Sequence, residues 1–261
     1  MIDTHAHLYD EKFLIDEPDH MARLADAGVR EVWMPNCHSS TIEAMLRWEQ
    51  KYPTLCRPMM GLHPCYVEKN FEEELRVVEE WMAKRRFFMI GEIGLDFYWD
   101  LTFREEQEEA FRRQLALAQH YQVPICIHSR NSQDGNESAI HRACEILEQM
   151  EGPSISGIFH CFSGNQEEAQ RILDLKTFFL GIGGVLTYKN SGLAEVVRTI
   201  SLDHLVLETD APYLAPVPYR GKRNEVSFIQ HTAEALSRLH QTTLQEVIYQ
   251  TTQNATKLST M

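Results

Sequence analysis

The chain has 261 residues, a length that suits one (β/α)8 barrel of roughly 250 residues or two smaller domains. Hydrophobic residues make up 43% of it, enough for a sizeable core, and the formal net charge at pH 7 is -13. This charge argues against a protein that coats polyanions in general, because such proteins carry broad basic faces. It leaves room for a nucleic acid whose phosphates are held locally by metal ions.

Cysteine usage and the N-terminus indicate the compartment. The six cysteines form no C-x-x-C pair, and a chain of this length needs no disulfide framework, so a reducing setting is expected. The opening MIDTHAHL lacks the basic region and apolar stretch of a signal peptide. No apolar run approaches the roughly 18 residues of a membrane span. We therefore expect a cytoplasmic protein with no membrane partner. Nothing signals self-association, so a monomer is plausible.

Short apolar runs, typical of parallel strands covered on both faces, alternate with helix-like stretches from end to end. The predicted strands are Met1–His5, Val29–Pro35, Arg57–Leu62, Phe87–Ile93, Pro124–His128, Ser156–His160, Phe178–Ile182 and Leu205–Glu208. The clearest helix is Leu101–Tyr121, with apolar residues near one face and charges opposite. The other predicted helices are Thr41–Lys51, Phe71–Arg86, Glu137–Met150, Gln166–Leu175, Gly192–Ile200, Ser227–Leu239 and Thr243–Thr256.

This alternation fits a closed barrel or an open, doubly wound sheet. The polar side chains that end the runs come from the first, fourth, fifth, sixth and eighth predicted strands. Barrel enzymes collect their groups from many strand ends, whereas an open sheet gathers its ligand at one switch point. The sequence therefore predicts an α/β fold, a single-domain (β/α)8 TIM barrel over residues 1–261. Its longest irregular stretch, Ala211–Asn224, is rich in proline and is the best candidate for a substrate loop.

A His-x-His pair, His5 and His7, stands at the first predicted strand. Residues two apart on an extended segment leave from the same face, so one strand can present both imidazoles to one ion. Asp3 shares that face and is expected to orient a histidine without binding metal itself. Taken alone, the pair also fits two ordinary histidines in a polar N-terminal loop.

Glu92 lies in the apolar segment MIGEIGLD, where Gly91 and Gly94 let a backbone or ligand approach closely. A glutamate in such a strand is costly unless it is paired or coordinated, and a carboxylate that bridges two cations would offset the cost. A buried ion pair with Arg130 is the alternative. Asp96 has the same parity as Glu92 and could assist the site or cap the following helix.

Three more candidates, His128, His160 and Asp210, each end an apolar run. A lone histidine there is more often a satisfied core residue, but two at the same depth of successive strands favour coordination. Asp210 is placed to hold one metal and to take a proton from bound water. Glu208 lies two residues before Asp210, so it should point to the same side of the strand, one layer deeper in the barrel. There it would hold a histidine or arginine, or form a structural ion pair.

Taken together, these groups exceed what one tetrahedral site needs. The set predicts two divalent metal ions, zinc with magnesium or manganese as alternatives, and metal-assisted hydrolysis.

His63, in GLHP at 61–64, lacks partners for another metal set. We assign it to the substrate as a hydrogen-bond donor to developing negative charge, with a capping or structural role as the alternative. Cys126 and Cys161 are expected to pack away from the mouth.

The motifs together resemble the TatD-like deoxyribonuclease family, within the amidohydrolase-type metal-dependent hydrolases. The matching segments are IDTHAHL at 2–8, GLHP at 61–64, GEIGLDFY at 91–98, HSR at 128–130, HCFSG at 160–164, ETDAPYL at 208–214 and RGKRN at 220–224. They span nearly the whole chain in order. The resemblance implies a TIM barrel and a divalent-metal-dependent nuclease, often exonucleolytic on DNA. It implies as metal ligands His5, His7, Glu92, His128, His160 and Asp210, with Glu92 between the ions.

The resemblance also implies a substrate path. His63 would contact the scissile phosphate, and the Tyr213–Asn224 loop would border the path with Arg220 as the main contact. Arg130 or Arg220 would stabilise charge on the phosphate, which suits a bidentate guanidinium. Three aromatic residues would stack on bases at the rim or simply pack there: Tyr98, Trp99 and Tyr188.

Two segments at the rim depart from the family pattern. Glu225 is followed by Val226 where a proline is common, and Asn131–Glu137 is longer and more polar than the usual acidic continuation. Both changes leave the ligand set intact and bear on substrate preference.

The expected function is hydrolysis of DNA phosphodiester bonds by metal-activated water, with exonuclease activity and with Asp210, His63 and Glu92 as catalytic residues. One alternative is hydrolysis of an amide, lactone or aminoacyl ester on the same scaffold. RGKRN and His63 suit a phosphate better. A non-enzymatic metal-binding protein would have lost ligands, and none is missing. The metal, the strand polarity and the choice between DNA and RNA are left open.

Overall fold

The computed structural model describes residues 1–99 and 101–259, so three residues of the predicted domain 1–261 lie outside it. Its strands pair in parallel and in chain order, within two sheets, β1-β2-β3 and β4-β5-β6-β7-β8. The strands are β1 (Ile2–Asp3), β2 (Glu31–Met34), β3 (Cys56–Pro58), β4 (Ile90–Asp96), β5 (Ile125–Arg130), β6 (Gly157–Phe159), β7 (Phe178–Ile182) and β8 (Leu205–Leu207). Each overlaps a predicted run.

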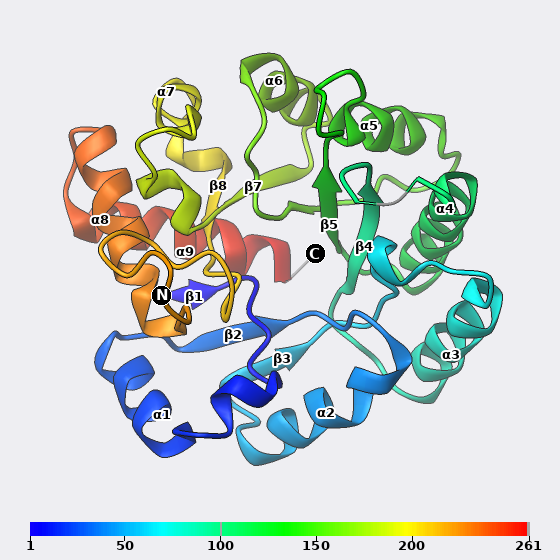
Figure 1. Ribbon diagram of the computed structural model, residues 1–261, viewed down its shortest axis with the longest axis horizontal. Coiled ribbons are helices and arrows are strands. Elements are labelled where there is room, and N and C mark those ends of the chain that lie inside the picture. The colour runs from blue at the N-terminus through cyan, green and yellow to red at the C-terminus, as the bar shows by residue number, and fades with distance from the viewer. Residues whose placement is uncertain (100, 260–261) are drawn as a thin grey trace.

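Single parallel bridges join the two sheets at both seams. Met60 pairs with Ile90 between β3 and β4, and Ala6 pairs with Ala211 just beyond β1 and β8. At the second seam the His7 amide also donates to the Ala211 carbonyl at 2.7 Å. The strands therefore run around a ring with most of the helices outside it, as expected for a TIM barrel (Figure 1).

The helices match the predicted stretches to within a few residues, with two exceptions. They are α1 (Glu17–Asp26), α2 (Ile42–Lys51), α3 (Phe71–Lys84), α4 (Arg104–Tyr121), α5 (Ala139–Gln149), α6 (Gln166–Asp174), α7 (Leu193–Val197), α8 (Ile229–Leu239) and α9 (Leu244–Ser259). Helix α7 is shorter than predicted, and α1 was not predicted. Within the described ranges, no helix is both long and apolar enough to cross a membrane.

An apolar layer fills the ring at the amino ends of the strands. It takes one buried side chain from each strand or its immediate flank: Ile2, Trp33, Met59, Met89, Cys126, Ile158, Phe179 and Val206. Ala255 and Leu258 of α9 pack against this layer, and α9 runs towards the centre of the ring in Figure 1. Since this end is filled, polar side chains gather at the opposite, carboxyl end of the strands, where barrel active sites form.

Gly94 allows β4 and β5 to continue beyond their predicted ends. Its φ is +140°, and a Cβ added there would lie 2.0 Å from the His128 carbonyl oxygen. The glycine thus lets the backbone of β5 come close, as the sequence suggested, and the pairing continues to Asp96 and Arg130. This longer pairing fixes the position of His128 along the strand direction, where it pairs with Gly94 of β4.

Candidate metal centre

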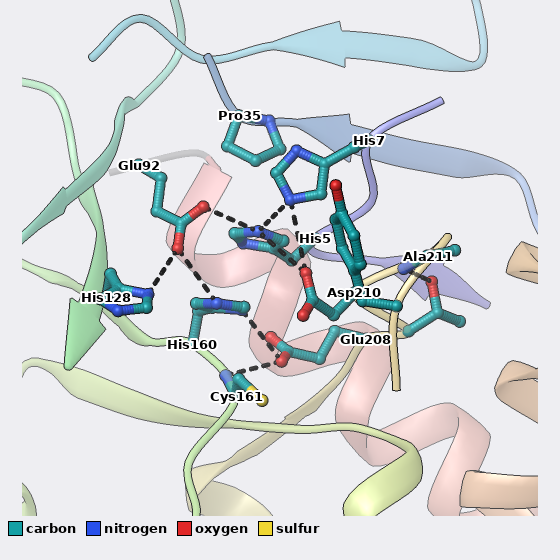
Figure 2. A network of polar contacts seen from close by, with 12 residues as sticks. His5, His7, Pro35, Glu92, His128, His160, Cys161, Glu208, Asp210 and Ala211 are labelled. Atoms are coloured by element: carbon teal, nitrogen blue, oxygen red, sulfur yellow. Dashed lines mark hydrogen bonds and ion pairs between the residues drawn. The ribbon is translucent and has the colours of Figure 1, made fainter. Parts of the chain in front are cut away.

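The predicted ligands converge at the carboxyl end of the barrel, although they come from five strand ends (Figure 2). On one side, the Nε2 atoms of His5 and His7 lie 3.3 Å apart. Both face Oδ1 of Asp210, at 3.6 Å and 3.4 Å. These three side chains place a ligand atom each within 4.8 Å of one another, which is close enough to share one cation.

Glu92 divides its carboxylate oxygens between two sets of imidazoles. Its Oε2 lies 3.2 Å from Nε2 of His5, whereas its Oε1 lies 3.0 Å from Nδ1 of His128 and 3.2 Å from Nε2 of His160. Figure 2 shows the carboxylate between these rings. The alternative ion pair with Arg130 is not formed, because that guanidinium lies over the ring of Tyr98, 3.7 Å from its centroid.

The imidazoles also keep Glu92 ionised. The side chain is only 2% exposed, and such burial opposes its ionisation. The neighbouring His63, His5 and His160 outweigh burial and hold the pKa of Glu92 well below its usual value. A buried anion without such compensation would be expensive.

Two of the candidate ligands have their tautomer fixed by a partner on the far nitrogen. Nδ1 of His160 lies 3.2 Å from Oε1 of Glu208, and a carboxylate can only accept, so this nitrogen carries the proton. The Tyr9 hydroxyl donates to the Pro35 carbonyl at 2.5 Å and must therefore accept from Nδ1 of His7 at 2.9 Å. In the neutral rings the Nε2 lone pairs are thus left facing the centre, which is the form that binds metal.

Asp96 and Cys126 hold the other two rings. Oδ2 of Asp96 lies 2.8 Å from Nε2 of His128, which leaves Nδ1 for the centre. Asp96 does not cap α4, whose N-cap position is Phe103. The sulfur of Cys126 lies 3.3 Å from Nδ1 of His5.

The expectation that both cysteines pack away from the site is only partly correct, because Cys126 packs in the buried apolar layer but its sulfur also contacts His5. Cys126 shares the parity of His128, so it faces the same side one layer deeper. Cys161 has a φ of +48°, outside extended geometry, so strand alternation does not apply to it, and it lines the cavity.

His63 presents a proton to the centre, whereas His7, His128 and His160 each present a lone pair in the neutral ring. Its Nδ1 accepts the Cys65 amide at 3.0 Å, where it caps the short 3-10 helix Pro64–Tyr66. Nε2 must then carry the proton of the neutral ring, and it faces Oε1 of Glu92 at 3.3 Å. Burial lowers the pKa of His63 and so favours that neutral ring. The cap and the donor, which the sequence left as alternatives, are compatible in one side chain. His63, Glu92 and His128 also place ligand atoms within 4.8 Å of one another, but a proton on Nε2 of His63 opposes coordination there.

Asp3 acts on the backbone and not on an imidazole ring, unlike the prediction. It is fully buried and accepts the amides of His5 and Thr209, each at 3.1 Å, and the Thr209 hydroxyl at 2.6 Å. Burial raises the pKa of Asp3 to about 8. Asp3 thereby ties the segment after β1 to the segment after β8. Asp210 is the residue after Thr209, and its backbone has a φ of +58°, a left-handed conformation that aspartate tolerates.

Glu208 contacts a histidine, the first of the two roles the sequence allowed. Its Oε1 accepts the Cys161 amide at 2.6 Å as well as Nδ1–H of His160.

We expect Glu208→Gln to weaken metal affinity about 10- to 100-fold, the usual effect of losing a partner that orients a ligand. Competition with a chelator measures the affinity. Glu74→Gln, a buried carboxylate on α3 that binds Ser39, is the matched control. Equal affinities for Glu208→Gln and the native chain would contradict this role.

The centre opens into a cavity of about 1190 Å³, to which the two predicted phosphate-binding arginines relate differently. Arg130 lines it. Arg220 is exposed and is not part of the lining, and its guanidinium lies 4.3 Å from the ring centroid of Tyr188. Arg223, in the same RGKRN segment, is held by ion pairs with Asp16 and Glu225. The structure thus places Arg130 in the cavity wall and Arg220 outside the lining.

The whole chain is similar to known proteins. The family model described as "TatD related DNase" matches residues 2–260. The Bacillus subtilis (strain 168) protein "Uncharacterized metal-dependent hydrolase YabD" is 35% identical over 259 residues, covering 99% of this chain and 98% of its own length. The crystal structure of YjjV, a TatD homologue from Escherichia coli K12, has a TM-score of 0.90 at 28% identity, covering 99% of this chain and 97% of its own. A TatD family hydrolase from Entamoeba histolytica, 22% identical, shares the fold with a TM-score of 0.83 over 99% and 97% of the two chains.

Proposed function

The chain belongs to the TatD-related DNase family and is a metal-dependent hydrolase, and from this premise we propose that it is an exonuclease that cleaves DNA phosphodiester bonds with two divalent cations. The observation that carries the proposal is the split carboxylate of Glu92, with His5 on one oxygen and His128 and His160 on the other. A carboxylate with that placement suits a bridge between two ions.

The donor set fits two cations of the zinc, magnesium or manganese type. His5, His7 and Asp210 with one oxygen of Glu92 would hold one ion. His128 and His160 with the other oxygen would hold the second. Nitrogen and oxygen donors of this kind suit zinc and manganese, and the carboxylates also suit magnesium. When bound, the ions would polarise a phosphoryl oxygen and make water more acidic.

Asp210 is the proposed general base. Burial opposes its ionisation, but the neighbouring imidazoles of His7, His160 and His5 outweigh burial and lower its pKa. The carboxylate is therefore ionised at neutral pH and can accept the proton of the attacking water.

His63 and Arg130 are the proposed contacts to the substrate phosphate. The Nε2–H of His63 points into the centre and can donate to an oxygen on which negative charge develops. Arg130 lines the same cavity and can offer its planar fork to phosphate oxygens. Lys12 adds a second cationic side chain to the lining. These donors favour an anionic substrate despite the acidic charge of the whole chain, and Arg220 would act further out along the path.

A nuclease assay tests the proposal. The full chain is stripped with EDTA, reloaded with magnesium, manganese or zinc, and incubated with 3′- or 5′-labelled single-stranded and duplex DNA. We expect mononucleotides to be released from one end only when metal is present. Turnover of a lactone, amide or aminoacyl ester, with no metal-dependent release from any DNA, would instead assign the site to the other hydrolase class.

A further inference from the structure

We propose that Trp99 is the base-stacking residue of this site, holding the nucleobase next to the scissile phosphate; the inference rests on the proposed nuclease function. Trp99 is 67% exposed, more than any other aromatic side chain in the described ranges. It lines the same cavity as His128 and Arg130. A large flat ring left in water beside a candidate metal centre provides a surface on which any base can stack.

The backbone of Trp99 is tied to the metal centre through one carboxylate. Oδ1 of Asp96 accepts the amides of Tyr98 at 2.9 Å and Trp99 at 3.3 Å, while its Oδ2 contacts Nε2 of His128 at 2.8 Å. From the other side, the side-chain amide of Gln133 donates to the Tyr98 carbonyl at 3.0 Å. A base on Trp99 would therefore have a fixed position relative to His128.

The structure separates Trp99 from the other two aromatic candidates. The guanidinium of Arg130 covers a face of Tyr98 at 3.7 Å from the ring centroid, and that of Arg220 covers a face of Tyr188 at 4.3 Å. Arg130 also lies over the ring of Trp99, but at a longer distance of 5.2 Å from its centroid, and Trp99 is still 67% exposed. Tyr98 thus serves to position Arg130, which lies where it can contact the phosphate of the nucleotide stacked on Trp99.

Gln133 links this arrangement to the unusual polar segment Asn131–Glu137. Within the segment, Asp134 accepts from Ser132 and from the Asn136 amide and side chain. The Glu137 carboxylate pairs with Arg104 at the start of α4. These contacts place Gln133 against Tyr98, so the segment helps to hold the proposed stacking residue and its neighbour.

A pair of chromogenic esters tests the stacking. Thymidine 5′-(p-nitrophenyl phosphate) and methyl p-nitrophenyl phosphate offer the same scissile bond, with and without a base. We expect the native chain to prefer the thymidine ester, and Trp99→Leu to lower the ratio of the two kcat/KM values by at least about fivefold. Trp99→Phe, which keeps an aromatic face, should recover most of the preference. Because the ratio is measured on one enzyme sample, changes in metal loading cancel.

Tryptophan fluorescence gives a second readout that needs no turnover. In EDTA, thymidine 5′-monophosphate should quench the native emission, whereas deoxyribose 5-phosphate should not. Of the other three tryptophans, Trp33 and Trp48 are 0% and 6% exposed and Trp81 is half-buried outside the cavity lining, so loss of the quenching in Trp99→Phe would assign the signal to Trp99.

The two proposals fail in different ways. If the native chain cleaves both esters and Trp99→Leu leaves their ratio within twofold, the stacking role is overturned and the nuclease function stands. If the native chain cleaves neither ester and releases no mononucleotide from labelled DNA with any of the metals, the nuclease function falls, and the stacking proposal falls with it.

Discussion

Glu92→Gln is expected to reduce kcat/KM at least about a thousandfold and to lower the metal content from two ions per chain towards one. The native carboxylate offers one charged oxygen to His5 and the other to His128 and His160. Glutamine keeps the shape but has one neutral oxygen and no charge to offset two neighbouring cations. Elemental analysis of the dialysed protein gives the stoichiometry, and the assay with labelled DNA gives the rate.

Controls separate this effect from misfolding. Circular dichroism and the thermal midpoint report whether the barrel is intact. Glu74→Gln removes another buried carboxylate, one bound to Ser39 outside the centre, and should keep both ions and the activity. A Glu92→Gln variant with two ions and a near-normal rate would remove Glu92 from the bridge.

His63→Asn is expected to lower kcat by about 100- to 1000-fold while both metal ions remain bound. The distinction follows from the tautomer, because Nδ1 of His63 accepts the Cys65 amide and the proton must lie on Nε2. Asparagine can still cap the Cys65 amide through its carbonyl oxygen, but it lacks the donor that reaches the centre. His128→Asn, by contrast, should lose metal. Metal content and single-turnover rates of both variants test the difference.

His38 offers a matched control for His63→Asn. It also caps a 3-10 helix, Ser39–Thr41, by accepting an amide on Nδ1, from Ser40 at 3.2 Å. His38→Asn makes the same exchange outside the cavity lining and should leave kcat unchanged. If His63→Asn lost metal as His128→Asn does, His63 would be a ligand and the tautomer argument would be wrong.

The sequence predicted the strands well because each is a short apolar run between polar residues, and burial on both faces leaves that pattern whatever the tertiary fold. Helix α1 was missed for the complementary reason. Its inward face has only His20 and Leu24 buried, so the apolar period is weak. The signals that could have found it are local, namely Pro18 in its first turn and Gly28 just beyond its end.

The convergence of the candidate ligands could be predicted because parallel strands in a barrel all end at one face. The partners of the imidazoles were harder to predict, since they come from distant positions. Glu208 meets His160 across 48 residues, and the Pro35 carbonyl that orients the Tyr9 hydroxyl is 26 residues away from it. Tyr9 itself shares the parity of His5 and His7, a signal that could have identified it.

The placement of the arginines depended on tertiary contacts that no motif encodes. Both arginines come late in their strand-and-loop segments, but only Arg130 belongs to a strand, as the last residue of β5, in register with Asp96 of β4. Arg220 lies in a proline-rich loop, where its position depends on packing against Tyr188. Motif order alone therefore could not rank the two as substrate contacts.

The most direct test is a crystal structure of the chain grown with manganese or zinc, with data collected at the absorption edge of the metal. The account predicts two anomalous peaks on either side of the Glu92 carboxylate, one against His5, His7 and Asp210 and the other against His128 and His160, with neither bound to His63. A single peak that Glu92 does not touch, or a cluster without bound metal at saturating concentration, would contradict it.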